Sequence, residues 1–294
     1  MSDFVLSCCS TVDVNSEWFI KRNIERVFFH LSVDGVELDD NIGVTITQEE
    51  LFKKMLNGAE AHSSQVNVTE YTEYFEKFLK EGKDILHVTL SSGISGTINS
   101  ANIAADELSD KYPDRKIYII DSLGASSGYG LFMDKLADLR DEGKTIDEIK
   151  DFALENRLKL QSWFYSNDLT FFIKGGRISK TSGTIGNLLN ICPFMEVAYD
   201  GSLQVREKIR TKKKVIKRVI SKIIEANPNG ENYCDKIWIS TSDMKSAIET
   251  RDALLEAFPA VKEIPINLIG GTISVHTGPG TVAVFFWGNE RIKQ

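Results

Sequence analysis

The first half of the chain alternates short, apolar, β-branched segments with longer segments in which apolar residues recur at helical spacing. Short β-branched runs predict buried strands, and a recurrence every three or four residues predicts an amphipathic helix. The predicted strands are residues 4–9, 26–32, 85–90 and 116–120. The predicted helices are residues 47–57, 68–81, a helix that begins at residue 98, 124–141 and 147–158. This alternation predicts a mostly parallel sheet with helices on both faces.

Local sequence signals support several of these boundaries. Two pairs of residues have the spacing of a capping box, in which each side chain bonds to the backbone of the other. These pairs are Thr47 with Glu50 and Asn67 with Glu70. Asp34-Gly35 predicts a hairpin turn, because both residues tolerate a positive φ. Residues 62–65, which lie between the two capped helices, are predicted to form a short polar loop.

The pattern changes after about residue 160. Residues 188–199 are predicted to hold a helix end and a strand, and Asp200-Gly201 turns that strand back into another at 202–206. The remaining predicted elements are helices at 213–226 and 243–258 and strands at 236–240, 261–268 and 281–287. We therefore expect an N-terminal α/β domain over residues 1–160 and a smaller C-terminal α+β domain over residues 161–294.

Composition narrows the possible partners and compartment. The hydrophobic share of 42% and the charged share of 26% are those of a globular protein. A net charge of −7 argues against nucleic acid or an anionic membrane as the general partner. The first 13 residues lack the apolar stretch of a signal peptide, and no later apolar run is long enough to span a bilayer. We therefore expect a cytoplasmic protein.

Residue types that carry metal or nucleotide chemistry are scattered or absent. The four cysteines and four histidines do not have metal-ligand spacing, so we expect free thiols and no metal site. The two Gly-rich motifs that cradle nucleotide phosphates are missing. The segment 93–97 resembles the nucleophile elbow of a hydrolase, but that motif would require glycine in place of Thr97.

The most informative stretch is residues 85–101, in which a predicted strand leads through a Ser/Gly loop, 91–97, into a helix. This arrangement directs unpaired backbone N–H groups and the positive end of the helix dipole at one point, which suits a carboxylate or a phosphate. The alternative is an ordinary turn in which Ser95 caps the helix. Ser10 and Asp121-Ser122 follow two other predicted parallel strands. Because ligands bind at the carboxyl ends of such strands, this convergence favours a binding site.

Three further segments could serve binding or structure. Gly175-Gly176 could let the backbone approach a ligand while Arg177 pairs with an anion, or the pair could form a turn with a solvated arginine. Residues 276–280 are predicted to form a rigid turn that presents His276 between two strands, although a lone histidine is more often structural. A basic series between residues 206 and 218 is more often a solvated face than a docking surface.

Five motifs, taken in this order, resemble the DegV family of fatty-acid-binding proteins, which includes the binding subunits of bacterial fatty acid kinase. The resemblance covers essentially the whole chain. The motifs are Ser63-Ser64-Gln65, Leu90-Ser-Ser-Gly-Ile-Ser-Gly-Thr97, Asp121-Ser122, Gly175-Gly-Arg-Ile-Ser179 with Leu188-Leu-Asn-Ile191, and His276-Thr-Gly-Pro-Gly280. Each motif alone is weak, but the ordered set is specific.

The resemblance implies a two-domain fold with a long-chain fatty acid, such as palmitate, stearate or oleate, between the domains and no other cofactor. The residues implied to hold its carboxylate are Ser63, Ser64, Ser92, Gly93, Ser95 and His276. Arg177 is implied to lie near this end, where we expect it to serve presentation of the carboxylate and docking of a kinase.

The implied role is a binding subunit and not an enzyme. The chain would present the carboxylate to the catalytic subunit of a fatty acid kinase, which converts it to an acyl phosphate, and would contact membranes only transiently to exchange lipid. The alternative is a stand-alone α/β phosphotransferase or hydrolase that uses the same anion pocket.

Three positions depart from the family pattern. Cys8-Cys9 stands where the family usually has Thr-Asp, so Cys9 replaces an acid of the family pattern. Ser63 replaces a threonine but keeps the hydroxyl. Val66 stands where the family usually has proline.

Overall fold

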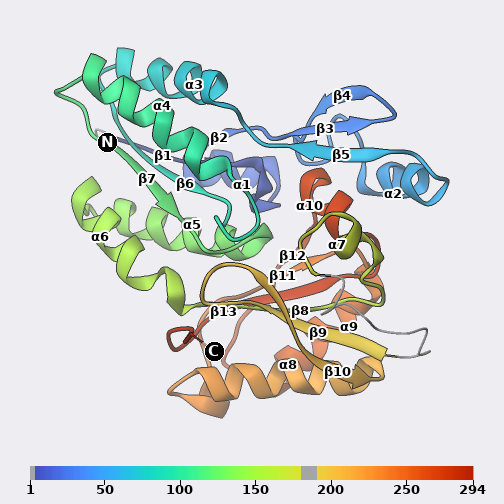
Figure 1. The fold of residues 1–294 in the computed structure, drawn as a ribbon. Coiled ribbons are helices and arrows are strands. Elements are labelled where there is room, and N and C mark those ends of the chain that lie inside the picture. The colour runs from blue at the N-terminus through green and yellow to red at the C-terminus, as the bar shows by residue number, and fades with distance from the viewer. Residues whose placement is uncertain (1–3, 180–190, 294) are drawn as a thin grey trace.

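The computed structural model describes residues 4–179 and 191–293, and its elements form stacked layers (Figure 1). The upper sheet is fully parallel, in the order β2-β1-β6-β7. Its strands are β1 (Phe4–Cys9), β2 (Glu25–Val27), β6 (Asp84–Thr89) and β7 (Ile117–Asp121). Helices α3 (Val68–Lys80) and α4 (Thr97–Lys111) cover one face, and α5 (Ser126–Asp141) and α6 (Ile146–Asn156) lie on the other (Figure 1). The parallel sheet flanked by helices that the strand–helix alternation predicts is confirmed.

A six-stranded mixed sheet lies beneath α5, in the order β10-β9-β8-β13-β11-β12. All neighbours are antiparallel except β11 and β12. Its strands are β8 (Leu160–Tyr165), β9 (Ile191–Val197), β10 (Leu203–Arg210), β11 (Ile237–Thr241), β12 (Ile266–Leu268) and β13 (Val282–Trp287). Helices α8 (Lys212–Ala226) and α9 (Met244–Ala257) cover its outer face (Figure 1). Helix α5 is therefore shared between the two large sheets.

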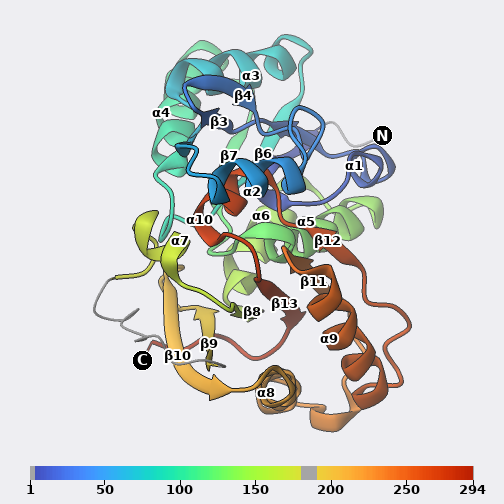
Figure 2. The same cartoon turned by 90° about the vertical axis from the view of Figure 1, so that its right-hand side faces the viewer.

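A small antiparallel sheet projects from the side of the parallel sheet, in the order β4-β3-β5. Its elements are β3 (His30–Val33), β4 (Val36–Asp39), β5 (Ala61–Ser64) and the adjoining helix α2 (Gln48–Leu56). Helix α10 (Gly271–Thr277) contacts β3, β5, α2 and the short helix α7 (Thr170–Lys174). Figure 2 shows α10 between the small sheet and the six-stranded sheet. A C-terminal element is thereby held against an N-terminal strand.

Most local predictions are confirmed. Both capping boxes form, at Thr47–Glu50 on α2 and at Asn67–Glu70 on α3. Asp34 and Gly35 have φ values of 51° and 79° and join β3 to β4 in a tight hairpin. These features depend on residues close together in the chain, which is why the sequence alone predicts them.

Several other predictions are wrong. The single strand expected over 26–32 is two strands, β2 and β3, which belong to different sheets. The loop expected at 62–65 is largely strand β5, because Ser63 and Ser64 pair with β3. Strand β12 is shorter than the 261–268 predicted. Strand β8 and helices α7 and α10 were not predicted. Residues 180–190, which include Leu188–Asn190 of the fourth motif and the start of the helix end predicted at 188–199, lie outside the described residues.

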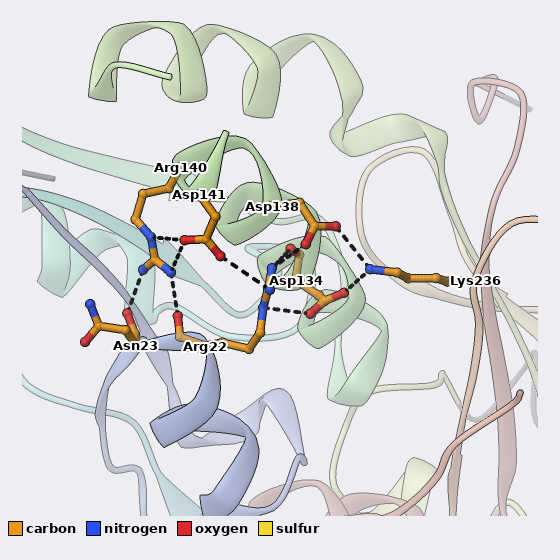
Figure 3. A network of polar contacts seen from close by, with 7 residues as sticks. All are labelled: Arg22, Asn23, Asp134, Asp138, Arg140, Asp141 and Lys236. Atoms are coloured by element: carbon orange, nitrogen blue, oxygen red, sulfur yellow. Dashed lines mark hydrogen bonds and ion pairs between the residues drawn. The ribbon is translucent and has the colours of Figure 1, made fainter. Parts of the chain in front are cut away.

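Helix α5 is anchored by a polar network drawn in Figure 3. Arg22, at the end of α1 (Ser16–Arg22), bonds to Asp134 at 3.1 Å and to Asp138 at 2.5 Å. Lys236, beside β11, reaches the same two carboxylates at 2.5 and 3.1 Å. One acidic face of α5 therefore joins an N-terminal helix to the six-stranded sheet.

The predicted boundary between residues 160 and 161 falls at the first residue of β8. The two large sheets do divide there in sequence, but one apolar core contains buried side chains from both sides, including Leu86, Phe132 and Phe285. Gly128 lets α5 approach β13, since a Cβ there would lie 2.3 Å from the Phe285 ring. The division into two domains therefore stays a prediction.

Candidate functional site

A cavity of about 560 Å³ lies between the carboxyl edge of the parallel sheet, helix α10 and the six-stranded sheet. Its volume is typical of small-molecule sites, which hold roughly 300–1,000 Å³. Polar groups gather where β5, the 91–97 loop and α10 meet, and the rest of the wall is mostly apolar. Six of the apolar lining residues are Phe164, Phe172, Val197, Leu203, Ala283 and Phe285.

Three residues from distant segments form a hydrogen-bonded chain at the polar end, which we call the Ser63 relay: Ser63, His276 and Arg177. Ser63 Oγ lies 2.8 Å from His276 Nε2, and His276 Nδ1 lies 3.3 Å from Arg177 Nη1. A guanidinium can only donate, so Nδ1 accepts and the imidazole proton resides on Nε2. Nε2–H then donates to Ser63 Oγ, which leaves the Ser63 hydroxyl proton free to donate into the cavity.

The electrostatics of the relay agree with this tautomer. Burial, followed by the charges of Arg177 and His62, lowers the pKa of His276 to about 4. The imidazole is therefore neutral near pH 7. Burial also lowers the pKa of Arg177, but arginine remains charged at any ordinary pH. A chain of hydrogen bonds that begins at a cation polarises each successive donor, so the Ser63 hydroxyl is a strengthened donor.

Backbone carbonyls fix the arginine of the relay. Arg177 Nε donates to the Ile94 carbonyl at 3.2 Å, and Nη1 donates to the Gly175 carbonyl at 2.7 Å. The first of these bonds links the 174–177 turn to the serine loop, 91–97. The guanidinium is therefore held next to the cavity and is not the freely solvated arginine of the alternative interpretation.

The serine loop supplies further hydroxyls. Ser92, Ser95 and, from β5, Ser64 line the cavity beside Ser63. Ser95 Oγ also accepts a hydrogen bond from the Thr97 N–H at 3.2 Å, but the N-cap residue of α4 is Gly96, so Ser95 precedes the helix and is not the N-cap that the structural alternative predicts. A hydroxyl that accepts from the backbone keeps its own proton as a donor. Ser95 can therefore hold the backbone of the serine loop and donate to a ligand at once.

Gly93 is placed differently from its predicted role. It is not among the residues that line the cavity. Its N–H donates to Ser91 Oγ at 3.1 Å, and a Cβ at this position would lie 2.3 Å from the Gly201 carbonyl carbon. Gly93 therefore allows the serine loop to pack against the turn between β9 and β10.

At Gly175 the backbone lies close to the His276 side chain, whereas the sequence predicted that it would approach a ligand. A Cβ at Gly175 would lie 2.4 Å from His276 Nδ1. The neighbouring Gly176 has a φ of +72°, which favours glycine. His276 itself lies on the last helical residues of α10, with the Gly-Pro-Gly turn after it, so the turn expected over 276–280 is correct only from Gly278 onward. The glycines of this motif therefore shape the relay.

The sequence did not identify the wall of the cavity that β13 and α10 form. Thr281, Ala283 and Phe285 line the cavity from alternate positions of the segment that forms β13. Strand alternation could have marked them, because this strand was predicted. The lining residues Thr272 and Ile273 lie on α10, which has no helical apolar period and was not predicted.

The described residues show neither the grouped ligands of a metal site nor a membrane-spanning helix. No group of three or more His, Cys, Asp or Glu side chains in residues 4–179 and 191–293 could hold a metal ion. Within the same ranges, no helix has the length and apolar character needed to cross a membrane.

Known structures share this fold along the whole chain. A lipid-binding DegV protein from Thermotoga maritima is 27% identical, with a TM-score of 0.83 over 99% of this chain and 100% of that one. A second Thermotoga maritima protein, described as revealing a fatty acid binding function, is 25% identical, with a TM-score of 0.80 over 98% and 100%. The Streptococcus pneumoniae Fatty Acid Kinase (Fak) B3 protein, loaded with linoleic acid, shares the fold at 24% identity and a TM-score of 0.83 over 98% and 100%.

Sequence comparison leads to the same family. A DegV domain-containing protein of Clostridium perfringens is 36% identical over 293 residues, which is 99% of each chain. The family model described as "Uncharacterised protein, DegV family" matches residues 9–289. This range includes the cavity, the serine loop and the Ser63 relay, and the chain belongs to the DegV family.

Proposed function

We propose that this chain binds a long-chain fatty acid, with the carboxylate at the Ser63 relay and the tail along the apolar wall of the cavity. The observation that carries the proposal is the relay itself, which provides a polarised hydroxyl donor where polar groups gather in a mostly apolar cavity. An ionised carboxylate only accepts hydrogen bonds, so it requires donors of this kind. The DegV relatives described as binding lipid or fatty acid support the same ligand class.

The two ends of the cavity contribute differently. Each buried methylene contributes about 0.8 kcal/mol, so a long tail contributes on the order of 10 kcal/mol before the costs of ordering it. A hydrogen bond to a charged group adds roughly 1.5–3 kcal/mol. The tail therefore dominates affinity, and the hydroxyls of Ser63, Ser64, Ser92 and Ser95 orient the carboxylate.

Binding of matched ligands tests this proposal. Delipidated protein is titrated with palmitate and with methyl palmitate, which has the same tail but no charge. We expect the ester to bind at least about tenfold more weakly, since the charge-assisted bonds are lost. Equal affinity would contradict the proposed carboxylate site, and no uptake of either ligand would contradict lipid binding altogether.

We further propose that the bound carboxylate is presented to a separate fatty acid kinase. The family resemblance supports this role, as does the Fak B3 protein by its fold. The position of Arg177 beside the polar end also supports it, because negative charge builds up there when a phosphoryl group is transferred. Fixed cations at such positions stabilise the transition state.

Arg177→Ala separates presentation from binding. We expect palmitate affinity to change only modestly because the tail dominates it, while acyl-phosphate formation with a fatty acid kinase falls by orders of magnitude. Arg177→Lys should restore little, since an ammonium cannot reproduce the two fixed donors of the guanidinium. Equal losses in affinity and turnover would assign Arg177 to carboxylate binding alone.

A further inference from the structure

Two buried carboxylates that do not line the cavity, Asp13 and Asp40, lie at the start of helix α10. Asp40 directly follows β4 and is 2% exposed, and Asp13 is 1% exposed. Asp40 has no ion pair in the part of the chain that the structure describes. A buried carboxylate without a cation is costly unless hydrogen bonds satisfy it. The donors to Asp40 therefore indicate what this side chain does.

Asp40 takes its hydrogen bonds from the backbone of α10. The Gly271 N–H donates to Asp40 Oδ1 at 3.1 Å, and the Thr272 N–H donates to Oδ2 at 2.8 Å. The first N–H groups of a helix have no partner within the helix. The N-cap residue, Gly270, has no side chain to satisfy them, and a Cβ there would lie 2.5 Å from Asp13 Oδ1. Asp40 therefore caps α10 from a segment 231 residues away from Gly271.

This distant cap ties α10 to the small sheet, beside which Figure 2 shows the helix. Strand β4, which Asp40 follows, pairs with β3, and β3 pairs on its other side with β5, the strand that carries Ser63. Val275 of α10 packs with Leu31 of β3 in a small apolar core. Ser63 and His276 therefore meet across two elements that Asp40 holds together.

We infer that Asp40 is a positioning residue, which fixes the start of α10 and thereby places His276 in the Ser63 relay. His276 lies four residues after Thr272, about 6 Å along the helix axis. Because α10 has only seven residues, a shift of its first turn moves His276 as well. The 2.8 Å bond between His276 and Ser63 tolerates little displacement. The consequence for carboxylate binding rests on the proposed function.

The titration of His276, followed by NMR in the lipid-free protein, tests this inference. Burial lowers the pKa of His276 to about 4 in the parent. Asp40→Ala should release α10 and let water reach the ring, so the titration midpoint should rise by at least about one pH unit toward the ordinary value near 6.5. Asp40→Asn keeps one acceptor oxygen and should lie between the two. The signal is assigned by its loss in His276→Gln.

Thr145→Ala is the matched control, because it removes the N-cap of α6 and leaves α10 intact. It should lose stability, yet its His276 should titrate as in the parent. Urea unfolding identifies the variants that are folded, and if Asp40→Ala is not, Asp40→Asn supplies the readouts.

A second readout is the ratio of the affinities for palmitate and methyl palmitate. We expect this ratio to fall from at least about tenfold in the parent to about threefold or less in Asp40→Ala, since the donors to the carboxylate are displaced while the tail stays buried. Thr145→Ala should keep the parent ratio.

The outcomes separate this inference from the proposed function. If His276 titrates as in the parent in the folded Asp40 variants, or shifts equally in Thr145→Ala, the inference is overturned. A shifted titration with an unchanged affinity ratio would overturn the role of Asp40 in carboxylate binding. If the parent itself does not distinguish palmitate from its ester, the proposed function fails, and the titration in lipid-free protein still decides whether Asp40 positions His276.

Discussion

Among the described residues, two Ser–His pairs have similar hydrogen-bond distances and different surroundings. Ser7 Oγ lies 2.6 Å from His87 Nδ1, and Ser63 Oγ lies 2.8 Å from His276 Nε2. The His87 ring is fully buried and surrounded by aromatic rings that meet it edge to face. His276, in contrast, lines two hollows. A Ser–His pair is therefore a candidate site only where its serine proton can reach a space for a ligand.

The further hydrogen-bond partners of Ser7 and His87 close the first pair off from any ligand space. Ser7 Oγ also receives a hydrogen bond from the Tyr74 hydroxyl at 3.1 Å, and the other ring nitrogen of His87 faces Cys9 Sγ at 3.7 Å. Cys9, which stands at the departure from the family pattern, thus belongs to a sealed polar network in the core. Burial raises the pKa of the Cys9 thiol to about 11, so it is a neutral packing residue.

The largest expected effect comes from disrupting the sealed pair. His87→Ala leaves a cavity in the core and removes the partner of Ser7, so it should lower the free energy of unfolding by about 2–5 kcal/mol. His276→Ala should cost less, because its ring already borders open space. Urea unfolding of both variants measures the difference, and equal losses would contradict the distinction between core and site.

The free energy of unfolding should fall in acid, because both histidines are held neutral in the folded protein. Burial lowers the pKa of His87 to about 3, and burial with the Arg177 charge lowers that of His276 to about 4. An unfolded histidine protonates near pH 6.5, so the unfolded state binds more protons and stability falls as pH drops from 6.5 toward these values. Each histidine should account for about 2 kcal/mol at pH 5.

The difference in unfolding free energy between a histidine variant and the parent separates the histidine contribution from that of Asp13. Burial raises the pKa of Asp13 well above its usual value, which gives stability the opposite slope above pH 4. The unfolding free energy of His276→Gln, subtracted from that of the parent at each pH, should therefore contain only the His276 share. A difference that does not change between pH 7 and pH 4.5 would contradict a neutral His276 in the relay.

Alanine variants of Ser63 and Ser7, with Ser109 as a control, should show smaller effects that differ between the two pairs. Ser63→Ala should weaken palmitate binding by roughly 1–3 kcal/mol, because one donor to the carboxylate is lost, with little change in stability. Ser7→Ala should show the reverse, and Ser109→Ala, on the exposed face of α4, should change neither. The measurements are palmitate titration and urea unfolding, and a loss of affinity in Ser7→Ala equal to that in Ser63→Ala would undermine the assignment.

The parts of the fold that the sequence predicts are those governed by near neighbours. The capping boxes at Thr47 and Asn67 and the hairpin at Asp34-Gly35 each involve residues within one turn. Pairing between strands that lie far apart in the chain has no comparable local signal in the sequence. Ser63 looked like part of a loop because its strand is defined by pairing with Leu31, and β8 was missed although it pairs with both β9 and β13.

The candidate site shows the same limit. Motifs marked Ser63, Arg177 and His276, yet the relay joins residues 213 and 99 positions apart, and only the fold brings them together. The motif glycines Gly93 and Gly175 were expected near a ligand, but they allow backbone to pack against Gly201 and His276. A glycine in a sequence indicates a close approach and does not identify what approaches it.

The most direct test of the central claim is the lipid that the protein carries after purification. The full chain is purified from a bacterial host without added lipid and denatured, and the released material is identified and quantified by mass spectrometry beside the Ser63→Ala variant. We predict about one equivalent of long-chain fatty acid per parent chain, because tail burial makes binding tight, and less in the variant. Less than about a tenth of an equivalent, with no uptake on later titration with palmitate, would contradict the claim, since burial of the tail alone should give measurable affinity.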